Sequence, residues 1–441
     1  MTVNEETTLG ERVTDFRARR GMSQRELAAE VRRSESWVSQ VERGVLHVER
    51  LPVLQALADA LGVAVRDLRP DAALLPRTSS HHHAIDLEAL RMVITGHPAP
   101  NLVLAAPVQA TADLAALTER VEHAWSLAHA SEFAALSGVL VELLPDLEDA
   151  WRLAEGGQRQ QLARLLAYAY QAASFAFARL DEADAAWVTA DRAVTVAELG
   201  GDPLGAFSGL FRMAHAFITL RRLDQAEHVA ATGIAALAPI AEGVSPTEPQ
   251  LSVYGALHLV RAIVYARAGR RTEAHEAIAK SRQIAARLGK DRNDYETEFG
   301  LTTVELHAIA VAVDLGDAGE ALEVASAIDA TGLSAERQSR MHIDLARAHA
   351  QRRHSGEALQ ALLTAEQHAP EQLRTHPLAR QLIRDLVALA GRRPSEGLLA
   401  LAARLQIYEI PATADPALRR PDEWALAKSG TAIPVRPRTQ A

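Results

Sequence analysis

The stretch SQRELAAEVRRSESWVSQVERG, at residues 23–44, decides the fold of the N-terminal region. Ser23 is followed three residues later by Glu26, a capping-box pattern that predicts the start of a helix. Ser34 predicts the start of a second helix, and Gly44 predicts its end. The stretch is therefore expected to form two short helices joined by a turn of a few residues.

Further helices are predicted on both sides of this stretch. Apolar residues recur at helical spacing within residues 9–20 and 51–61, and residues 65–68 add one more turn. Two short helices joined by a tight turn, inside a five-helix unit, form the pattern of a helix-turn-helix. Residues 1–70 are therefore predicted to be a small all-α domain.

Two stretches of this region resemble the phage-repressor/XRE family of DNA-binding domains. They are residues 23–44 and LPVLQALADALGVAVRDL at 51–68, and the resemblance covers about 60 residues. It implies a lambda-repressor-like helix-turn-helix fold that binds a double-stranded DNA operator. A homodimer is expected, because one recognition helix buries too little surface for tight specific binding. Arg32 departs from the family, since many members carry Gly there, and a left-handed backbone at Arg32 would cost about 1 kcal/mol.

The resemblance also assigns DNA contacts to single residues. Gln24 and Arg43 would bind phosphate, and Gln40 would read adenine through its amide. The full set of predicted DNA-contacting residues is Gln24, Arg25, Arg33, Ser34, Glu35, Ser36, Ser39, Gln40 and Arg43. Further candidates for phosphate contacts are Arg17, Arg19, Arg20 and Arg32. The alternative is that these side chains only solvate a small helical domain that binds another protein.

Residues 111–411 show only helical periodicity, broken by short segments that contain Gly, Asp or Pro. An acidic residue or Gln followed by Ala recurs at intervals of 43, 48, 47 and 37 residues, and we call these the anchor pairs. The anchor pairs are Glu182-Ala183, Gln225-Ala226, Glu273-Ala274, Glu320-Ala321 and Glu357-Ala358. Each is predicted to open the second helix of a helical hairpin. Small residues at matching positions, where helices would approach closely, are Ala190, Ala214, Gly233, Ala262, Ala346 and Ala365.

This repetition resembles the tetratricopeptide repeat (TPR), with units longer than usual. The resemblance implies a right-handed α-solenoid of six or seven hairpins with a concave groove. The chain as a whole resembles XRE/TPR regulators of high-GC Gram-positive bacteria and, more distantly, peptide-pheromone-responsive regulators. The runs AWSLAHASEF (124–133) and DRNDYETEFGLTTVELHAIAVAVDLGDAGEA (291–321) carry the closer likeness.

In such arrays the first helix of each hairpin lines the groove, and polar residues stand at most of the inward positions of this chain. The predicted groove residues are Ser208, Arg212, His215, Arg261, Asn293, Tyr295, Thr303, His307, Arg340, Asp344 and Arg347. Arginines suit a carboxylate or phosphate, and the neutral groups suit a peptide backbone. The alternatives are a solvated concave surface, hydrogen bonds between repeats, a buried ion pair for Arg261, and a helix cap at Asn293 or Asp291.

The remaining segments are predicted to be a linker and a tail. Residues 71–110 contain several prolines and a short amphipathic helix at 86–95. The three histidines at 81–83 resemble a metal tract, but no second cluster with ligand spacing follows, so a linker is the better interpretation. Residues 412–441 form a Pro-rich tail in which Trp424 is the only bulky aromatic residue.

The composition and the absence of certain motifs exclude several classes of protein. The 441 residues include no cysteine, which excludes disulfides and thiolate metal sites, and the net charge of −9 argues against a general basic surface. Motifs for nucleotide binding, zinc proteases and serine hydrolases are absent, so we predict no enzyme activity, cofactor or metal. No apolar run reaches the ~18 residues of a membrane span, and the polar N-terminus lacks a signal-peptide pattern. A cytoplasmic location is therefore expected.

These predictions combine into one functional hypothesis. The chain is expected to be a transcriptional regulator that binds its operator as a homodimer and senses a peptide or small molecule in the TPR-like groove. The alternative is an adaptor whose TPR-like region binds a partner protein, with the N-terminal domain only localising it.

Overall fold

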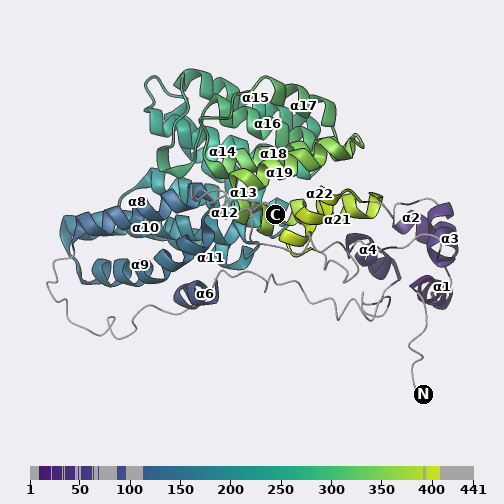
Figure 1. Cartoon of the computed structure of the whole chain (residues 1–441). Helices are drawn as coiled ribbons and strands as arrows, with labels where there is room; N and C mark the ends of the chain where they lie inside the picture. Colours follow the sequence, from purple (N-terminus) through teal and green to yellow (C-terminus); the bar gives the residue numbers. More distant parts are fainter. Residues whose placement is uncertain are drawn as a thin grey trace, which may run out of the picture. The chain divides into compact units, whose positions relative to one another are not determined.

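The computed structural model divides into two compact units, residues 1–83 and 84–441. The protein is all-α, since every described element is a helix (Figure 1). The residues that the structure describes are 9–20, 22–31, 33, 35–44, 48, 51–61, 63, 68, 87–95, 113–390 and 394–407.

The first unit has four described helices around one apolar core. They are α1 (Leu9–Arg19), α2 (Gln24–Glu30), α3 (Glu35–Glu42) and α4 (Leu51–Leu61). Val13, Leu27, Val38 and Leu57, one from each helix, are fully buried in that core. The helical spacing of apolar residues thus places one face of every helix inside, as predicted.

Local features of the first unit agree with its sequence. The predicted capping box is confirmed: Ser23 Oγ accepts from the backbone N–H of Glu26 at 3.2 Å, and the Glu26 carboxylate accepts from the N–H of Ser23 at 2.7 Å. Helices α1 and α3 approach so closely at Gly10 that an added Cβ would collide with backbone oxygens of α3. The predicted N-cap Ser34 and residues 64–67 lie outside the described part of the chain.

The second unit is a succession of helical hairpins. Its elements are α6 (Leu87–Thr95), α8 (Leu114–Ala130), α9 (Phe133–Leu153), α10 (Gly156–Arg179), α11 (Ala183–Leu199), α12 (Pro203–Thr219), α13 (Leu223–Ala241), α14 (Glu248–Arg267), α15 (Arg271–Leu288), the 3-10 helix η2 (Asp294–Glu296), α16 (Leu301–Leu315), α17 (Ala318–Ser326), α18 (Ala335–Gln351), α19 (Ser355–His368), α20 (Pro370–Thr375), α21 (Pro377–Ala390) and α22 (Glu396–Arg404). From α8 to α19, consecutive helices pack in pairs and each pair packs on the next.

The sequence repeat corresponds to this hairpin repeat. All five anchor pairs lie at the start of a second helix, namely α11, α13, α15, α17 and α19, which confirms their predicted place. The small residues of the repeat are buried where helices meet; Ala214, Ala262 and Ala346 are fully buried. A larger side chain at these positions would push neighbouring helices apart, which is why Ala and Gly recur there.

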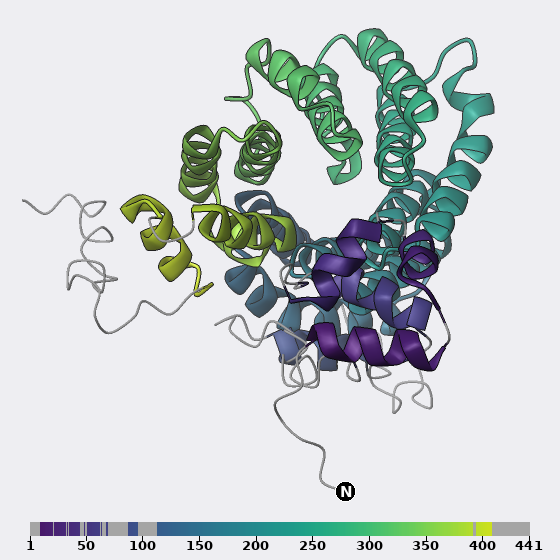
Figure 2. The same ribbon diagram turned by 90° about the vertical axis from the view of Figure 1, so that its right-hand side faces the viewer.

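The hairpins form an arc that brings the late helices back to the first ones (Figure 2). Helix α18 packs against α8, although the two are far apart in the sequence. Ser131 Oγ donates a hydrogen bond to Gln372 Oε1 at 2.9 Å, and the Glu371 carboxylate accepts from the N–H of Ala134 at 3.1 Å. Both bonds join the α8–α9 hairpin to α20, so side chains close the arc.

The segment between α15 and α16, residues 289–300, has an unusual backbone. Tyr295, Glu296 and Glu298 adopt positive φ angles of 52°, 57° and 48°, a region that non-glycine residues rarely occupy. The ring of Phe299 packs directly against Gly255 of α14, in the place that a Cβ of residue 255 would take. The contact of Phe299 with Gly255 anchors the end of this connection, whose backbone is strained at the three positive-φ residues.

The same connection contains the predicted helix cap. Asp291 accepts a hydrogen bond from the N–H of Thr302 at 3.2 Å, so its carboxylate satisfies one backbone donor in the first turn of α16. Asn293 precedes η2 but makes no side-chain cap bond there. Asn293 therefore holds the predicted N-cap position, but of η2, while the N-cap residue of α16 is Gly300 and Asp291 adds a hydrogen bond to its first turn.

Helix α6 belongs to the second unit, where it packs against α9 and α11. Its Arg91 donates to Asp184 Oδ2 at 2.8 Å and also pairs with Glu182. The rest of the predicted linker, with the histidines at 81–83, and the predicted tail with Trp424 lie outside the described residues. No described helix is both long enough and apolar enough to cross a membrane.

Candidate functional sites

The first candidate site is the outer face of α3 in the first unit. Val38 is fully buried on the inner side, while Glu35 and Arg43 are exposed and Ser39 and Gln40 are half-buried on the outer side. Arg43 Nε donates to the backbone oxygen of Ser39 at 3.2 Å. The face therefore offers an amide, a hydroxyl and a guanidinium within two turns of one helix.

Other predicted DNA contacts surround this face. Arg25 and Arg33 are exposed, and the Arg33 guanidinium lies over the Trp37 ring, 5.7 Å from its centre. Ser34 and the side chain of Ser36 are not among the described atoms.

Gln24 and Arg17 have structural partners inside the first unit. Arg17 Nε lies 2.5 Å from a carboxylate oxygen of Glu42, and Gln24 Nε2 donates to the other oxygen at 2.6 Å. Only 5% of the Glu42 side chain is exposed. The ion pair removes Arg17 from the set of free phosphate contacts, whereas Gln24 keeps a second amide proton for the predicted contact.

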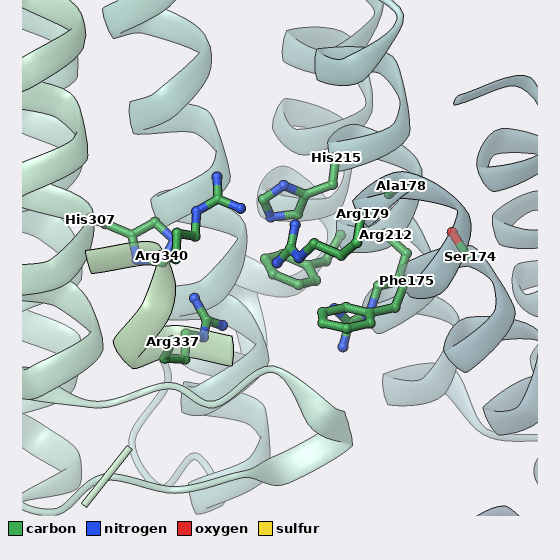
Figure 3. Close-up of a pocket in the computed structure, with 10 residues that line it drawn as sticks. Ser174, Phe175, Ala178, Arg179, Arg212, His215, His307, Arg337 and Arg340 are labelled. Carbon is green, nitrogen blue, oxygen red and sulfur yellow. The ribbon is translucent and has the colours of Figure 1, made fainter. Parts of the chain in front are cut away.

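The second candidate site is a small cavity between helices of the second unit (Figure 3). Its basic lining, which we call the arginine cluster, consists of Arg179 on α10, Arg212 on α12, and Arg337 and Arg340 on α18. The cavity volume is about 20 Å³, room for about one water molecule. Its other lining residues are Ser174, Phe175, Ala178, Phe211, His215 and His307.

Two carboxylates accompany the arginine cluster. Arg179 Nε lies 2.7 Å from an oxygen of Glu336, whose side chain is completely buried. Arg337 Nε lies 3.1 Å from Glu298 and 3.8 Å from Glu336. Four guanidinium groups thus share two carboxylates.

Arg212 and Arg340 have no carboxylate partner among the described residues. Arg212 is 5% exposed, stacks on Trp125 at 5.0 Å, and donates to the backbone oxygen of Glu296, while its Nε has no hydrogen-bond partner. The half-buried Arg340 side chain has no hydrogen bond or ion pair within the described part of the chain. Positive charge therefore exceeds negative charge around the cavity.

This environment shifts the pKa values of the lining residues. Burial, with Arg179 and Arg337 nearby, lowers the pKa of Arg212 to about 9. Burial, and next the charge of Arg337, lowers the pKa of His307 to about 3. Burial and the arginines likewise lower the pKa of His215 well below its usual value. Both histidines are consequently neutral near pH 7, and the positive charge resides on the arginines.

A larger pocket of about 510 Å³, the outer pocket, lies next to the arginine cluster. Trp125 lines this pocket and also stacks on Arg212, so it separates the two spaces. The volume is in the range of small-molecule sites. The lining residues of the outer pocket are Leu114, Thr118, Val121, Glu122, Trp125, Gln161, Arg164, Leu165, Tyr168, Asp202, Tyr295 and Glu296.

His129 joins α8 to the 289–300 connection beside the outer pocket. Its Nε2 lies 2.8 Å from Glu296 and its Nδ1 lies 3.3 Å from Glu298. Burial lowers the pKa of His129, but hydrogen bonds to the two glutamates outweigh burial and raise it to about 9. The runs at 124–133 and 291–321, which carry the family likeness, therefore meet in space.

Comparison with known proteins identifies the first unit. Residues 8–72 match the model of a helix-turn-helix domain family. This stretch is a helix-turn-helix domain. No curated protein matches the chain. Among solved structures the chain is similar to PlcR of Bacillus thuringiensis in complex with the peptide PapR7 and DNA, with 12% identity, a TM-score of 0.32, and coverage of 79% of this chain and 98% of that chain.

Within the helix-turn-helix domain, α2 and α3 are the two helices of the motif, in the places that the sequence predicted. Helix α3 is the second of them, which in this fold lies in the DNA major groove. Its exposed polar face is formed by residues that were predicted to contact bases.

The predicted groove residues divide into three groups. Arg212, His215, His307 and Arg340 line the cavity of the arginine cluster, and Tyr295 lines the outer pocket. These five are brought together around the two spaces, although the four cavity residues lie deep between helices rather than on an open groove wall.

The second group consists of Ser208 and Thr303, whose side chains are buried. The prediction that these two residues form an open groove wall is wrong. Ser208 is fully buried and donates to Gln171 Oε1 at 2.8 Å. Thr303 is 1% exposed, and its backbone oxygen lies 2.8 Å from Nδ1 of His307. The alternative prediction, a hydrogen bond between repeats, holds for Ser208, because Gln171 lies on the preceding hairpin.

The third group lies elsewhere or is already paired. Arg347 forms ion pairs with Asp344 at 2.8 Å and Asp314 at 2.5 Å, so neither Arg347 nor Asp344 is free for a ligand. Arg261 contacts His258 Nδ1 at 3.1 Å and is not in an ion pair among the described residues. Asn293 donates to Glu296 at 2.6 Å.

Sequence reasoning missed Arg179 and Arg337. Arg179 lies at the C-terminal end of α10, outside the register used for groove positions, and Arg337 lies one turn before Arg340. Counting along a single helix gives no sign that both meet Arg212. Only closure of the arc brings α18 to α10.

One set of metal-type ligands exists in the described part of the chain. Atoms of His275, Asp317 and Glu320 lie within 4.8 Å of one another. Asp317 is already paired with Arg271, which accounts for its position without a metal.

Proposed function

We propose that this protein is a DNA-binding transcriptional regulator whose second unit senses a ligand. The helix-turn-helix domain at residues 8–72, with its exposed polar face on α3, is the observation that carries this proposal. Such domains place the second motif helix in the major groove, where amide and guanidinium groups read base edges.

The proposed DNA contacts have distinct tasks. Gln40 reads a base, because its amide can donate to and accept from adenine at once. Arg43, Arg25 and Arg33 contact phosphates and set the affinity of the domain for any DNA. Two copies of the chain bind two half-sites about one helical turn apart, because one small domain buries too little surface for tight binding.

The sensing part of the proposal rests on the interior of the second unit. The outer pocket has the volume of a ligand site, and the neighbouring arginine cluster carries unbalanced positive charge. A ligand there would contact α8, α10 and the 289–300 connection, which also join the ends of the arc. It can change DNA binding only to the extent that it binds two arrangements of the arc with different affinity.

Selection of genomic fragments by the purified full-length protein tests the proposal. The wild type should enrich a short inverted repeat, and Gln40→Ala should lose or relax it. Gln283→Ala, which removes an exposed glutamine of α15, is the matched control and should enrich the same repeat. Sedimentation on the enriched fragment should give two protein chains per repeat.

The same experiment can contradict the proposal. Equal enrichment by wild type and Gln40→Ala would refute α3 as the base-reading helix. No enrichment, either alone or after addition of a cell extract that contains the ligand, would favour an adaptor that binds another protein.

A further inference from the structure

The carboxylates around the arginine cluster are too few to neutralise its four guanidinium groups. Arg179 and Arg337 share Glu336 and Glu298, and Glu298 also lies beside the charged His129. No carboxylate is among the described residues that line the cavity. Two positive charges therefore remain without a carboxylate among the described residues, one on the buried Arg212 and one on the half-buried Arg340. An unpaired charge is most disfavoured at the buried Arg212.

The unpaired donors belong to residues that face the cavity. Arg340 extends from α18 and has no hydrogen-bond or ion-pair partner in the described part of the chain, and Arg212 approaches from the opposite side with an unbonded, buried Nε (Figure 3). Guanidinium groups present planar pairs of donors that match the oxygens of phosphate and carboxylate. Converging unpaired donors are what an oxyanion site requires.

We infer that the arginine cluster binds a doubly charged phosphate group, either inorganic phosphate or the phosphate end of a larger ligand. Two negative charges balance the two that the protein leaves uncompensated, whereas a single carboxylate balances one. The cavity has room for about one water molecule, so it admits the anion only when its lining side chains move apart, and it does not widen enough for a peptide. Arg340 is half-buried and loses no partner among the described residues when it moves. A larger ligand would extend past Trp125 into the outer pocket.

The lowered pKa values of Arg179 and Arg212, about 10 and about 9, agree with this inference, because burial and mutual repulsion disfavour their charged forms without an anion. The role of the anion as a signal rests on the proposed function, but its binding does not. Phosphate binding and DNA binding are therefore measured separately.

The test uses the full-length protein exchanged into phosphate-free buffer at constant ionic strength. Calorimetric titration and thermal unfolding are followed with inorganic phosphate, glycerol 3-phosphate, acetate and chloride. The wild type should bind phosphate saturably and unfold at a higher temperature with it, while chloride and acetate should have little effect. Tighter binding of glycerol 3-phosphate would identify a phosphate monoester as the ligand class, and equal or weaker binding would identify the free ion.

Arg340→Gln is the decisive variant. Removal of an unpaired charge should leave the unfolding temperature without phosphate equal to or above that of the wild type, and should weaken phosphate binding about tenfold or more. Arg347→Gln is the control on the same helix, since Asp314 and Asp344 already neutralise Arg347. It should lower the unfolding temperature and keep the phosphate affinity of the wild type.

Three results would overturn the inference: unsaturable binding, an equal effect of chloride, or unchanged phosphate affinity in Arg340→Gln. Binding to the enriched DNA fragment is then measured with and without phosphate. Loss of all specific DNA binding with phosphate binding intact would overturn the proposed function and leave the anion site standing. An unchanged DNA affinity would overturn the role of the anion as a signal.

Discussion

Arg179 on α10 and Glu336 on α18 form an ion pair in which Nε and a carboxylate oxygen are 2.7 Å apart, with the Glu336 side chain completely buried. The pair joins helices from opposite ends of the hairpin series. It lies at the edge of the arginine cluster, where Glu336 is also 3.8 Å from Arg337. Closure of the arc and the charge balance of the cavity therefore depend on the same carboxylate.

Replacing this carboxylate should destabilise the second unit. Glu336→Gln removes one charge of a buried pair and leaves Arg179 uncompensated, so we expect a loss of about 3–5 kcal/mol in the free energy of unfolding. Urea unfolding followed by circular dichroism measures the change. Glu305→Gln breaks an exposed pair with Arg282 and should cost less than about 1 kcal/mol. Similar small losses in both variants would show that Glu336 does not hold the arc closed.

The contact between Phe299 and Gly255 gives a prediction about packing. Gly255→Ala places a methyl group where the Phe299 ring lies, and we expect a loss of about 1–3 kcal/mol from overpacking. Adding Phe299→Leu should recover part of that loss, which a double-mutant cycle of urea unfolding measures. Gly319→Ala in α17, where no atom hinders a Cβ, should instead stabilise by about 0.5–1 kcal/mol. Additive effects at 255 and 299 would contradict the contact.

The stabilising contribution of protonated His129 should be lost as the pH rises. Its pKa is about 9 in the folded protein, against 6.5 for the free side chain. Its stabilising effect is complete below pH 6.5 and is lost as pH rises through about 9, by about 1.4 kcal/mol for each unit of pKa difference. The free energy of unfolding of His129→Gln should lack this decline between pH 6.5 and 9. His228→Gln, an exposed histidine of α13, should behave like the wild type.

His307 should make the folded protein less stable as the pH falls, whereas His129 lowers stability as the pH rises. Its folded pKa of about 3, lowered by burial and by Arg337, means that only the unfolded chain gains this proton between pH 6.5 and 3. Stability should therefore fall as pH falls below 6.5. His307→Gln should reduce the slope of unfolding free energy against pH in that interval. The charges of Arg340 and Arg179 also lower the pKa of His307. The slope of unfolding free energy against pH should therefore be shallower in Arg340→Gln than in the wild type. A slope equal to that of the wild type in both His307→Gln and Arg340→Gln would refute this account.

Gln40 and Arg43 should differ in how they affect DNA binding. Gln40→Ala should cost about 1–3 kcal/mol on the specific site and little on random DNA, because the amide reads a base. Arg43→Ala should weaken both equally and reduce the slope of log affinity against log salt by about one, because it loses one phosphate contact. Fluorescence anisotropy at several salt concentrations distinguishes them. The same pattern for both variants would contradict the assigned roles.

Local structure followed from the sequence because its causes lie within a few residues. The Ser23–Glu26 capping box needs only four positions, and the anchor pairs mark helix starts that recur with each hairpin. The position of half-buried Gln40 and exposed Arg43 on the face opposite the buried Val38 follows from the periodicity of α3. Neither the fold class nor the candidate DNA-binding face required knowledge of distant contacts.

Which residues form the arginine cluster could be learned only from the tertiary structure. Helical register placed Arg212 and Arg340 on inward faces, but it did not show that Ser208 would be buried or that Arg347 would be neutralised by Asp314. The arginine cluster exists because the successive hairpins pack into an arc in which α18 returns to α8 (Figure 2). That return depends on every helix interface together, so no local pattern in the chain records where its ends will meet.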